Sequence, residues 1–482
     1  MTARRLSDLL QRDLADDPMI VGVTADSRKV APGFLFAALP GSTVDGKSFV
    51  SAALARGAAA VIAGEDMPGL AAPVVCVGDP RRAYALAAAA FFGAQPQVCV
   101  AVTGTNGKTS VAGFCRQIFA AAGYSSASMG TLGVRAGADQ LTPPGLTTPD
   151  AADVAAMMAT LAARGVTHLA LEASSHGIDQ RRLDGVRFAA TGFLNLTQDH
   201  LDYHGTMGAY RAAKLRLFED LAPRGTTAVL NADSDAYPAF AAAAVSNGLA
   251  ILSVGAMGEG LTLAGRVLIP DGQRLTIKAE GRAYDVVLPL AGAFQVSNAL
   301  VAAGLAIAAG VPRQTAVAAL ESLEGAPGRL QAVGCGPRGG EAYVDYAHTP
   351  DGLATVLAAL RPHARGKLIV VFGAGGDRDR GKRPKMGAIA ADLADVAIVT
   401  DDNPRSEDSA TIRADIRAGA PGLQEVPGRA AAIAAGVARL NDGDILVVAG
   451  KGHEQGQIIG AQVFPFDDVR ETRVALGLEA PR

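Results

Sequence analysis

A continuous apolar run that leads directly into a glycine-rich loop constrains the fold of this chain more than any other feature. The run covers residues 98–102 (VCVAV) and the loop covers residues 103–110 (TGTNGKTS). Because the run shows no alternation of apolar and polar residues, it is typical of a central parallel strand buried on both faces. The amphipathic segment that follows ends at Gly123 and predicts a helix. Strand, loop and helix in this order predict a doubly wound α/β domain.

The glycine-rich loop is suited to binding the phosphates of a nucleotide. Its glycines allow backbone N–H groups to surround phosphate oxygens, and the amino terminus of the following helix favours their charge. Lys108 would reach the β and γ phosphates, and Thr109 or Ser110 would supply a hydroxyl to Mg²⁺. The spacing is a shortened G-x-x-G-K-T, since Val102 stands where the full motif has a glycine. A glycine-rich turn with an incidental lysine is the alternative, and the flanking strand and helix disfavour it. The predicted nucleotide contacts are Gly104, Thr105, Asn106, Gly107, Lys108, Thr109 and Ser110.

The length and the turn-rich breaks of the chain predict three domains. A chain of 482 residues is too long for one ordinary core. Residues 1–97 carry short apolar runs between Gly, Pro and Asp turns, which indicates a small α/β domain. Residues 98–326 alternate buried strands with helices and predict a central P-loop domain with a doubly wound parallel sheet. The same pattern restarts after a break at 324–328, so residues 327–482 are predicted to form a Rossmann-like domain.

Charge and hydropathy narrow the class of partner. The formal net charge is -3 with no long basic run, which argues against nucleic acid or an anionic membrane and favours small polar substrates. The longest apolar stretch, residues 300–311, is shorter than the roughly 20 residues that cross a bilayer, and it predicts a buried helix. The amino terminus lacks the pattern of a secretion signal, so the expected location is the cytoplasm.

The cysteines do not form a pattern of their own. They are Cys76, Cys99, Cys115 and Cys335. Their wide separation and the lack of a C-x-x-C pair argue against a zinc site or a disulfide framework. The expectation is that they are buried free thiols.

Two clusters after predicted strands are candidates for a metal site. Glu172 ends the apolar run 168–172, and a carboxylate at the carboxyl end of a buried strand lies where open α/β sheets bind ligands. An exposed acid at a strand end is an equally open alternative. His200 lies among acids in the segment 195–205 (NLTQDHLDYHG), after the next strand. The cluster indicates a Mg²⁺ site, although oxygen ligands are the commoner choice for that ion.

The motifs TGTNGKTS, EASSHG, NLTQDHLDYHG and YRAAKLRLF, in this order, resemble the central domain of the Mur ligases. The resemblance implies an ATP-dependent ligase that phosphorylates a carboxylate and lets an amine attack the acyl phosphate. It assigns Glu172 and His200 to Mg²⁺, together with Thr109, and makes Lys214 a lysine carboxylated by CO₂, whose carbamate would be an anionic metal ligand. The implied catalytic residues are Lys108, Glu172, His200 and Lys214, and no general base is identified. A long surface lysine is the alternative for Lys214.

A motif in the third predicted domain resembles one branch of the family. Asp402-Asn403-Pro404-Arg405 is similar to the motif by which that branch recognises meso-diaminopimelate, whose distal carboxylate Arg405 could pair with bidentately. Lysine lacks this carboxylate and would leave the guanidinium unpaired. An Asx-Pro turn closed by a surface arginine is the alternative in isolation. The other positions that match family contacts to the amino acid are Arg378, Gly450 and Glu454.

The resemblance also implies a nucleotide-sugar site and further ATP contacts. The residues it assigns to a UDP-N-acetylmuramoyl dipeptide are Ser27, Ser42, Thr43, Val44, Thr147, Thr148, Ser174, Gln180 and Arg182. Asn298 and Arg329 resemble ATP contacts, and Asp345 and His348 match positions near the nucleotide. The expectation is therefore a monomeric amide ligase that adds meso-diaminopimelate to UDP-N-acetylmuramoyl-L-alanyl-D-glutamate for peptidoglycan. A lysine-adding sister ligase or another P-loop ATPase is the alternative.

Overall fold

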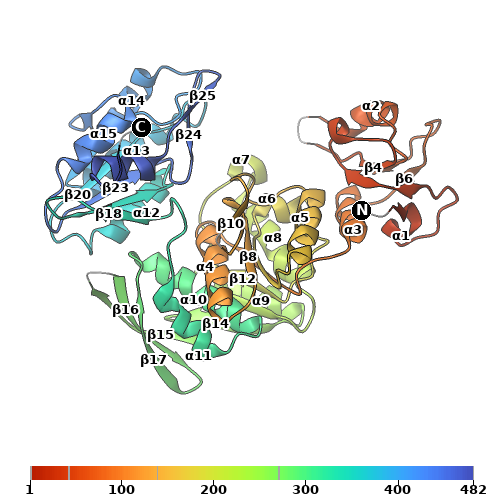
Figure 1. The fold of residues 1–482 in the computed structure, drawn as a ribbon, viewed down its shortest axis with the longest axis horizontal. Helices are drawn as coiled ribbons and strands as arrows, with labels where there is room; N and C mark the ends of the chain where they lie inside the picture. The colour runs from red at the N-terminus through yellow and green to blue at the C-terminus, as the bar shows by residue number, and fades with distance from the viewer. Residues whose placement is uncertain (1–2, 42–43, 138, 270–271, 481–482) are drawn as a thin grey trace. The chain divides into compact units, whose positions relative to one another are not determined.

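The computed structural model describes residues 3–41, 44–137, 139–269 and 272–480. The chain divides into two compact units. The first unit is Met1–Ala264, Ile277–Tyr284 and Ser297–Leu320; the second is Gly265–Thr276, Asp285–Val296 and Glu321–Arg482. Figure 1 shows helices packed on sheets in the N-terminal, central and C-terminal parts. The mixed α/β fold class is confirmed, while the domain boundaries after residues 97 and 326 stay a prediction.

The N-terminal part of the first unit contains a small parallel sheet. Its strands, in spatial order, are β3 (Gly22–Thr24), β4 (Phe34–Ala37), β5 (Ala60–Ala63) and β6 (Val74–Cys76). A short ladder of β1 (Arg4–Arg5) and β2 (Met19–Ile20) and helices α1 (Leu6–Leu10), α2 (Val50–Ala55) and α3 (Pro80–Phe92) complete it. Leu35, Ile62 and Tyr84 share one buried apolar cluster with Ala151 and Ala155 of α5 (Ala151–Ala163). Helix α3 is therefore packed on the central part of the unit.

The central sheet of the first unit is mainly parallel. Its strands run in the order β10 (Asp139–Thr142), β9 (Gly133–Ala136), β8 (Ser126–Gly130), β11 (His168–Glu172), β7 (Val98–Thr103), β12 (Ala190–Phe193), β13 (Thr227–Asn231) and β14 (Ala250–Gly255). Strands β8 to β14 in this order pair in parallel, whereas β9 and β10 pair antiparallel. Glu172 is paired with Val102, and Phe193 with Thr103. The segments that follow β7, β11 and β12 therefore meet at one edge of the sheet.

Helices cover the central sheet. Besides α5 they are α4 (Lys108–Ala121), α6 (Ser175–Asp179), α7 (Leu201–His204), α8 (Met207–Arg216), the π-helix η3 (Leu217–Leu221), α9 (Tyr237–Ser246), α10 (Ala293–Ala308) and α11 (Arg313–Ala318). Three further strands, β15 (Leu261–Ile269), β16 (Gly272–Ala279) and β17 (Arg282–Leu288), contain residues of both units. Residues 300–306 and Val311 of the apolar stretch are buried, as predicted, whereas residues 307–309 are half-buried and Gly310 is exposed.

The second unit is built on a six-stranded sheet. The order is β18 (Gln331–Cys335), β19 (Glu341–Asp345), β23 (Ile445–Ala449), β20 (Leu368–Phe372), β21 (Val396–Val399) and β22 (Gln424–Glu425), parallel except for β18. Its helices are α12 (Pro350–Leu360), α13 (Lys382–Leu393), α14 (Ser409–Arg417), α15 (Arg429–Val437) and α16 (Asp468–Ala475), and a hairpin joins β24 (Gly456–Ile459) to β25 (Gln462–Pro465). Consecutive residues of β20, Val370 and Val371, enter apolar clusters on opposite faces. Both faces of this sheet are therefore covered, which explains its continuous apolar runs.

The prediction that all four cysteines are buried is wrong for two of them. Cys99 and Cys115 are buried, whereas Cys76 and Cys335 are exposed. Cys76 ends β6 and Cys335 ends β18, and both strands lie at the edge of their sheet. An apolar run in a sequence does not distinguish an edge strand from a central one. Within the described ranges, no helix is long and apolar enough to cross a membrane.

Candidate active site

The loop after β7 is held tightly by contacts within the protein. Gly107 begins α4 with a φ of 90°, and a Cβ there would collide with the side chain of the buried Asn298. The Lys108 ammonium donates to the carbonyl oxygens of Gly104 and Thr105, each at 2.8 Å. The loop therefore has the glycine conformation and the lysine that phosphate binding requires.

Glu172 is a buried carboxylate with several donors. Its Oε2 accepts from the Thr109 hydroxyl at 2.9 Å and from the Thr131 hydroxyl at 3.2 Å, and its Oε1 accepts from the Thr131 N–H at 2.8 Å. The alternative of an exposed strand-end acid is thus wrong. Of Thr109 and Ser110, both buried, Thr109 is the one hydrogen-bonded to Glu172. A carboxylate and a hydroxyl beside a phosphate loop are oxygen donors of the kind that Mg²⁺ takes.

Lys214 lies in the interior, on α8. Its Nζ donates to the Gly104 carbonyl oxygen at 2.8 Å and lies 4.5 Å from the centroid of the Tyr210 ring. Only 1% of Lys214 is exposed, so the alternative of a surface lysine is wrong. Burial, with the neighbouring Lys108 cation adding to it, lowers the pKa of Lys214 well below its usual value. These surroundings therefore disfavour the charged ammonium form of Lys214.

His200 lies in a cluster of rings. It precedes α7 with a φ of 53°, and its Nε2 lies 3.4 Å from an Asp199 carboxylate oxygen. Its ring meets that of His176 edge-on with centroids 4.8 Å apart. Among the residues that the structure describes, no group of three or more His, Cys, Asp or Glu could hold a metal ion. The predicted ligands Thr109 and Glu172 are brought together, and His200 does not join them in such a group.

Five of the predicted nucleotide-sugar residues form one hydrogen-bonded group. The Thr148 hydroxyl lies 3.0 Å from the Ser174 hydroxyl and donates to the Glu172 carbonyl oxygen at 2.9 Å. Arg182 donates to the Thr148 carbonyl oxygen at 2.6 Å and to the Gln180 amide oxygen at 2.7 Å. The fifth member, Thr147, shares a hydroxyl hydrogen bond of 2.9 Å with Thr131. This group adjoins the Glu172 carboxylate through the backbone.

The other predicted nucleotide-sugar residues lie in the N-terminal part. Ser27 begins the short 3-10 helix η1 (Ser27–Lys29), and Val44 is exposed in the loop after β4. Ser42 and Thr43 lie outside the described residues.

In the second unit, Asn403 joins two predicted site loops. Its amide oxygen accepts from the Lys451 ammonium at 2.8 Å and from the Ile458 N–H at 3.0 Å, and its amide nitrogen donates to Glu454 at 2.8 Å. A Cβ at Gly450, whose φ is 123°, would stand 2.6 Å from an Asp402 carboxylate oxygen. The two loops therefore pack so closely that residue 450 has to be glycine.

The Arg405 guanidinium approaches a third loop, the one after β20, to which Arg378 belongs. Arg405 has a φ of 54° and donates to the Gly376 carbonyl oxygen at 2.8 Å. A Cβ on Gly375 would lie 2.8 Å from Arg405 and 3.8 Å from the Arg378 side chain. The strands β20, β21 and β23 are neighbours, so their loops bring together all the predicted amino-acid contacts: Arg378, Asp402, Asn403, Pro404, Arg405, Gly450 and Glu454.

Arg329 and Asp345 lie near each other at the start of the second unit. The Arg329 guanidinium stacks on the Tyr346 ring at 4.6 Å from the centroid. The buried Asp345 carboxylate accepts from the N–H groups of Leu330 at 2.6 Å and Ala347 at 2.7 Å. Burial raises the pKa of Asp345, against the opposing effect of Arg329. Asn298 belongs to the first unit and Arg329 to the second.

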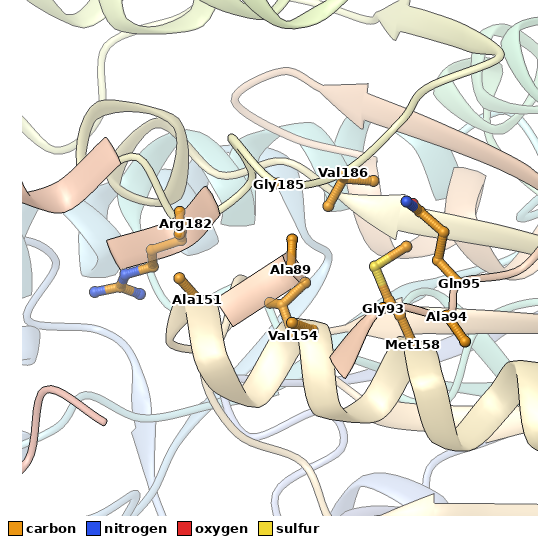
Figure 2. A pocket seen from close by; sticks show the side chains of 12 residues that line it. Ala89, Gly93, Ala94, Gln95, Ala151, Val154, Met158, Arg182, Gly185 and Val186 are labelled. Atoms are coloured by element: carbon orange, nitrogen blue, oxygen red, sulfur yellow. The ribbon is translucent and has the colours of Figure 1, made fainter. Parts of the chain in front are cut away.

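A pocket in the first unit lies away from this chemistry. Figure 2 shows that it is lined mostly by small side chains of α3, α5 and the segment 182–186. Arg182 is the predicted site residue that contributes to its lining, and the lining residues include no acid, histidine or cysteine. It is not the catalytic centre.

Two residues that this geometry singles out were not predicted from the sequence. Thr131 follows β8 at the same sheet edge and holds Glu172. Lys451 follows β23 and contacts both Asn403 and Glu454. The position of each within two residues of a strand end was a usable signal, since that edge of the sheet carries the ligands.

Three family patterns cover most of the chain. The catalytic domain of the Mur ligase family matches residues 19–99, the Mur ligase middle domain residues 102–306, and the Mur ligase glutamate ligase domain residues 328–452. The chain belongs to the Mur ligase family. The resemblance inferred from the motifs is thus confirmed.

Similar proteins place the chain within the Mur ligases. A Caulobacter vibrioides protein named UDP-N-acetylmuramoyl-L-alanyl-D-glutamate--2,6-diaminopimelate ligase is 67% identical, with 99% of this chain and 100% of the relative covered. A Mesorhizobium japonicum protein of the same name is 54% identical, with 95% of each covered. A solved structure of an enzyme of that name is 34% identical, covers 99% of both chains and gives a TM-score of 0.75. A MurF ligase from Thermotoga maritima in complex with ADP, 18% identical over 92% of this chain and 94% of its own with a TM-score of 0.61, shares the fold.

Proposed function

We propose that this Mur ligase adds meso-2,6-diaminopimelate to UDP-N-acetylmuramoyl-L-alanyl-D-glutamate, with ATP cleaved to ADP and phosphate, as a step of peptidoglycan precursor synthesis. The observation that carries the proposal is the 67% identity to a ligase of that name over the whole chain. The three loops of the second unit add a physical reason. Arg405, which can pair with a carboxylate, lies two residues after Asn403, whose amide donates to Glu454, a residue that can pair with an ammonium group. Diaminopimelate carries both groups at its distal end.

The proposed reaction has two steps. An oxygen of the substrate carboxylate attacks the γ phosphorus of ATP and ADP leaves; the amine nitrogen then attacks the acyl carbon, loses a proton, and phosphate leaves. Lys108 exchanges its two carbonyl partners for phosphate oxygens and neutralises their charge. Thr109 and Glu172 supply oxygen ligands for Mg²⁺, which spreads the charge of the phosphates when bound. The remaining loop residues and Asn298 complete the proposed ATP site, with Arg329 from the second unit.

We propose that Lys214 is carboxylated. A neutral, buried amine is the form that attacks CO₂: the N–C bond forms, one proton leaves, and an anionic oxygen pair results. The nearby Lys108 cation that disfavours a charged amine would favour this anion. The carbamate would join Glu172 and His200 as a metal ligand.

The nucleotide-sugar site is proposed to extend over the first unit. Thr147, Thr148, Ser174, Gln180 and Arg182 supply hydroxyl, amide and guanidinium groups in one hydrogen-bonded group. The residues proposed to contact the other end of the substrate are Ser27, Ser42, Thr43 and Val44. A cytoplasmic monomer fits the proposal, since every substrate is small and polar.

The test is phosphate release from ATP in the presence of the UDP-linked dipeptide, with meso-diaminopimelate or L-lysine as the amine. We expect diaminopimelate to drive turnover and Arg405→Ala to raise its KM by about a hundredfold, the effect of an unpaired charged hydrogen-bond partner. Arg365→Ala, at an arginine whose side chain is 78% exposed, is the matched control. Equal turnover with lysine would point to a lysine-adding ligase, and no amine-dependent turnover would reject the proposed reaction.

A further inference from the structure

Lys451 is a buried cation at the edge of the second sheet. It is the second residue after β23 and lies between Gly450 with a φ of 123° and Gly452 with a φ of 54°. A Cβ on Gly452 would lie 2.7 Å from the Gly328 carbonyl oxygen. The two glycines give the turn the close packing that buries Lys451, whose exposed fraction is 0%.

The contacts of Lys451 orient two groups of the proposed amine site. Its Nζ donates to the Asn403 amide oxygen at 2.8 Å and lies 3.2 Å from the Glu454 Oε2, which also accepts from the Asn403 amide nitrogen. With its oxygen facing Lys451 and the Ile458 N–H, the Asn403 amide has one orientation that satisfies all three partners. Lys451 and Glu454 together carry no net charge.

We propose that Lys451 is a positioning residue that also determines amine specificity, an inference that rests on the proposed function. It holds the Asn403 amide and the Glu454 carboxylate in place. It also places a fixed positive charge beside them.

The charge matters because the competing amines differ in net charge. At neutral pH diaminopimelate carries two ammonium and two carboxylate groups, whereas lysine carries two ammonium groups and one carboxylate. Lys451 offsets the charge of Glu454, which would otherwise attract lysine as a whole and leave diaminopimelate nearly unaffected. Arg405 would pair with the distal carboxylate of diaminopimelate, and Lys451 disfavours the excess positive charge of lysine.

The experiment measures kcat and KM for diaminopimelate, and the turnover or inhibition constant for L-lysine, in wild type, Lys451→Met, Lys451→Gln and Lys451→Arg. We expect Lys451→Met to raise the KM for diaminopimelate and to shift the selectivity ratio toward lysine by about tenfold, the scale of one lost charge interaction. Lys451→Gln keeps a hydrogen-bond donor without the charge and should shift the ratio similarly. Lys451→Arg keeps the charge and should retain the ratio.

Several controls separate this role from general loosening. A purely structural role would weaken both amines equally, leave the ratio unchanged and overturn the proposal. The KM for ATP should not move, and Lys385→Met, at an exposed lysine of α13, should leave every constant unchanged. If Lys451→Met does not fold, the ratio for Lys451→Gln against Lys451→Arg decides the matter. If wild type releases no phosphate with diaminopimelate, the proposed function fails; if it does and the ratio stays constant, only the role of Lys451 fails.

Discussion

The edges of the two parallel sheets each bury one lysine, and the two lysines have opposite surroundings. Lys214 donates to a backbone carbonyl and lies near another cation, Lys108. Lys451 lies between an amide oxygen and the carboxylate of Glu454. The first environment disfavours a positive charge, whereas the second offers a carboxylate as its partner. Burial alone therefore does not tell what a lysine does; its neighbours decide whether it can react or serves as a fixed charge.

The largest effect is expected when Lys214, the proposed carboxylated lysine, is replaced. We expect Lys214→Ala to lower kcat by about a thousandfold, because a proposed carbamate ligand in the phosphoryl-transfer site is lost. Phosphate-release kinetics check this, with Lys278→Ala on β16 as the control. A loss below about threefold would mean that Lys214 supplies no metal ligand.

The cost of an unpaired charge near the end of β23 can be tested at the ion pair of Arg429 and Asp468. Arg429 and Asp468 are fully buried and bonded through two contacts of 2.7 and 2.6 Å, and Arg429 also donates to the Ala449 carbonyl oxygen at the end of β23. Arg429→Met leaves the Asp468 carboxylate buried without its partner. We expect it to lower the free energy of unfolding of the second unit by about 3 kcal/mol.

Urea unfolding checks the value, and the double variant Arg429→Met with Asp468→Leu is the informative control. Replacing both partners should restore much of the loss, because no uncompensated charge remains. If the double variant is as unstable as the single one, lost packing and not the unpaired charge accounts for the lower stability.

A smaller effect is expected at Thr131, which donates to the proposed metal ligand Glu172. Thr131→Val removes the hydroxyl that donates to Glu172 at 3.2 Å and keeps the backbone N–H that donates at 2.8 Å. We expect the apparent affinity for Mg²⁺ to fall by about tenfold, as for other residues that orient a ligand. Titration of Mg²⁺ in the phosphate-release assay measures it. Thr167→Val, at a threonine at the opposite end of β11, is the control.

The smallest effect concerns pH and again separates the two lysines. The pKa of Lys214 is lowered by folding, so the unfolded chain binds more protons below about pH 10, and this site destabilises the folded chain there. In CO₂-free buffer Lys214→Met should raise Tm at pH 7 by about 2 °C, and the gain should shrink as pH rises toward 10. Thermal unfolding at several pH values measures it. A gain that does not change with pH would mean that Lys214 is charged in the folded state.

The site loops could be located from the sequence because a parallel sheet places ligands at its carboxyl edge. Glu172 ends one apolar run and Asn403 follows another. Each run forms a strand that pairs in parallel within its own sheet. Their partners Thr131 and Lys451 also follow strands, but the contacts that give them a role join residues 41 and 48 positions apart in the sequence. The same holds for Lys214, which looks like any polar residue on a helix until α8 packs against the phosphate loop.

The strands β15 to β17 and the exposed cysteines show a different limit. Strand β16 alternates buried with more exposed residues for part of its length, a pattern that the alternation of apolar and polar residues in the sequence indicates. The exposure of Cys76 and Cys335 depends on the order of strands in a sheet, and that order is a property of the topology and not of the strand itself. Local sequence patterns therefore predict which helices and strands form better than they predict which elements lie next to one another.

Those two exposed thiols allow the wild-type chain to be labelled with a pair of fluorescent dyes. Cys76 belongs to the first unit and Cys335 to the second, so a maleimide dye would label each unit once. Cys99 and Cys115 are buried, and burial raises the pKa of Cys99 to about 12, which keeps the less reactive thiol form. Fluorescence transfer between the two labels would follow the separation of the units during turnover without a single engineered residue.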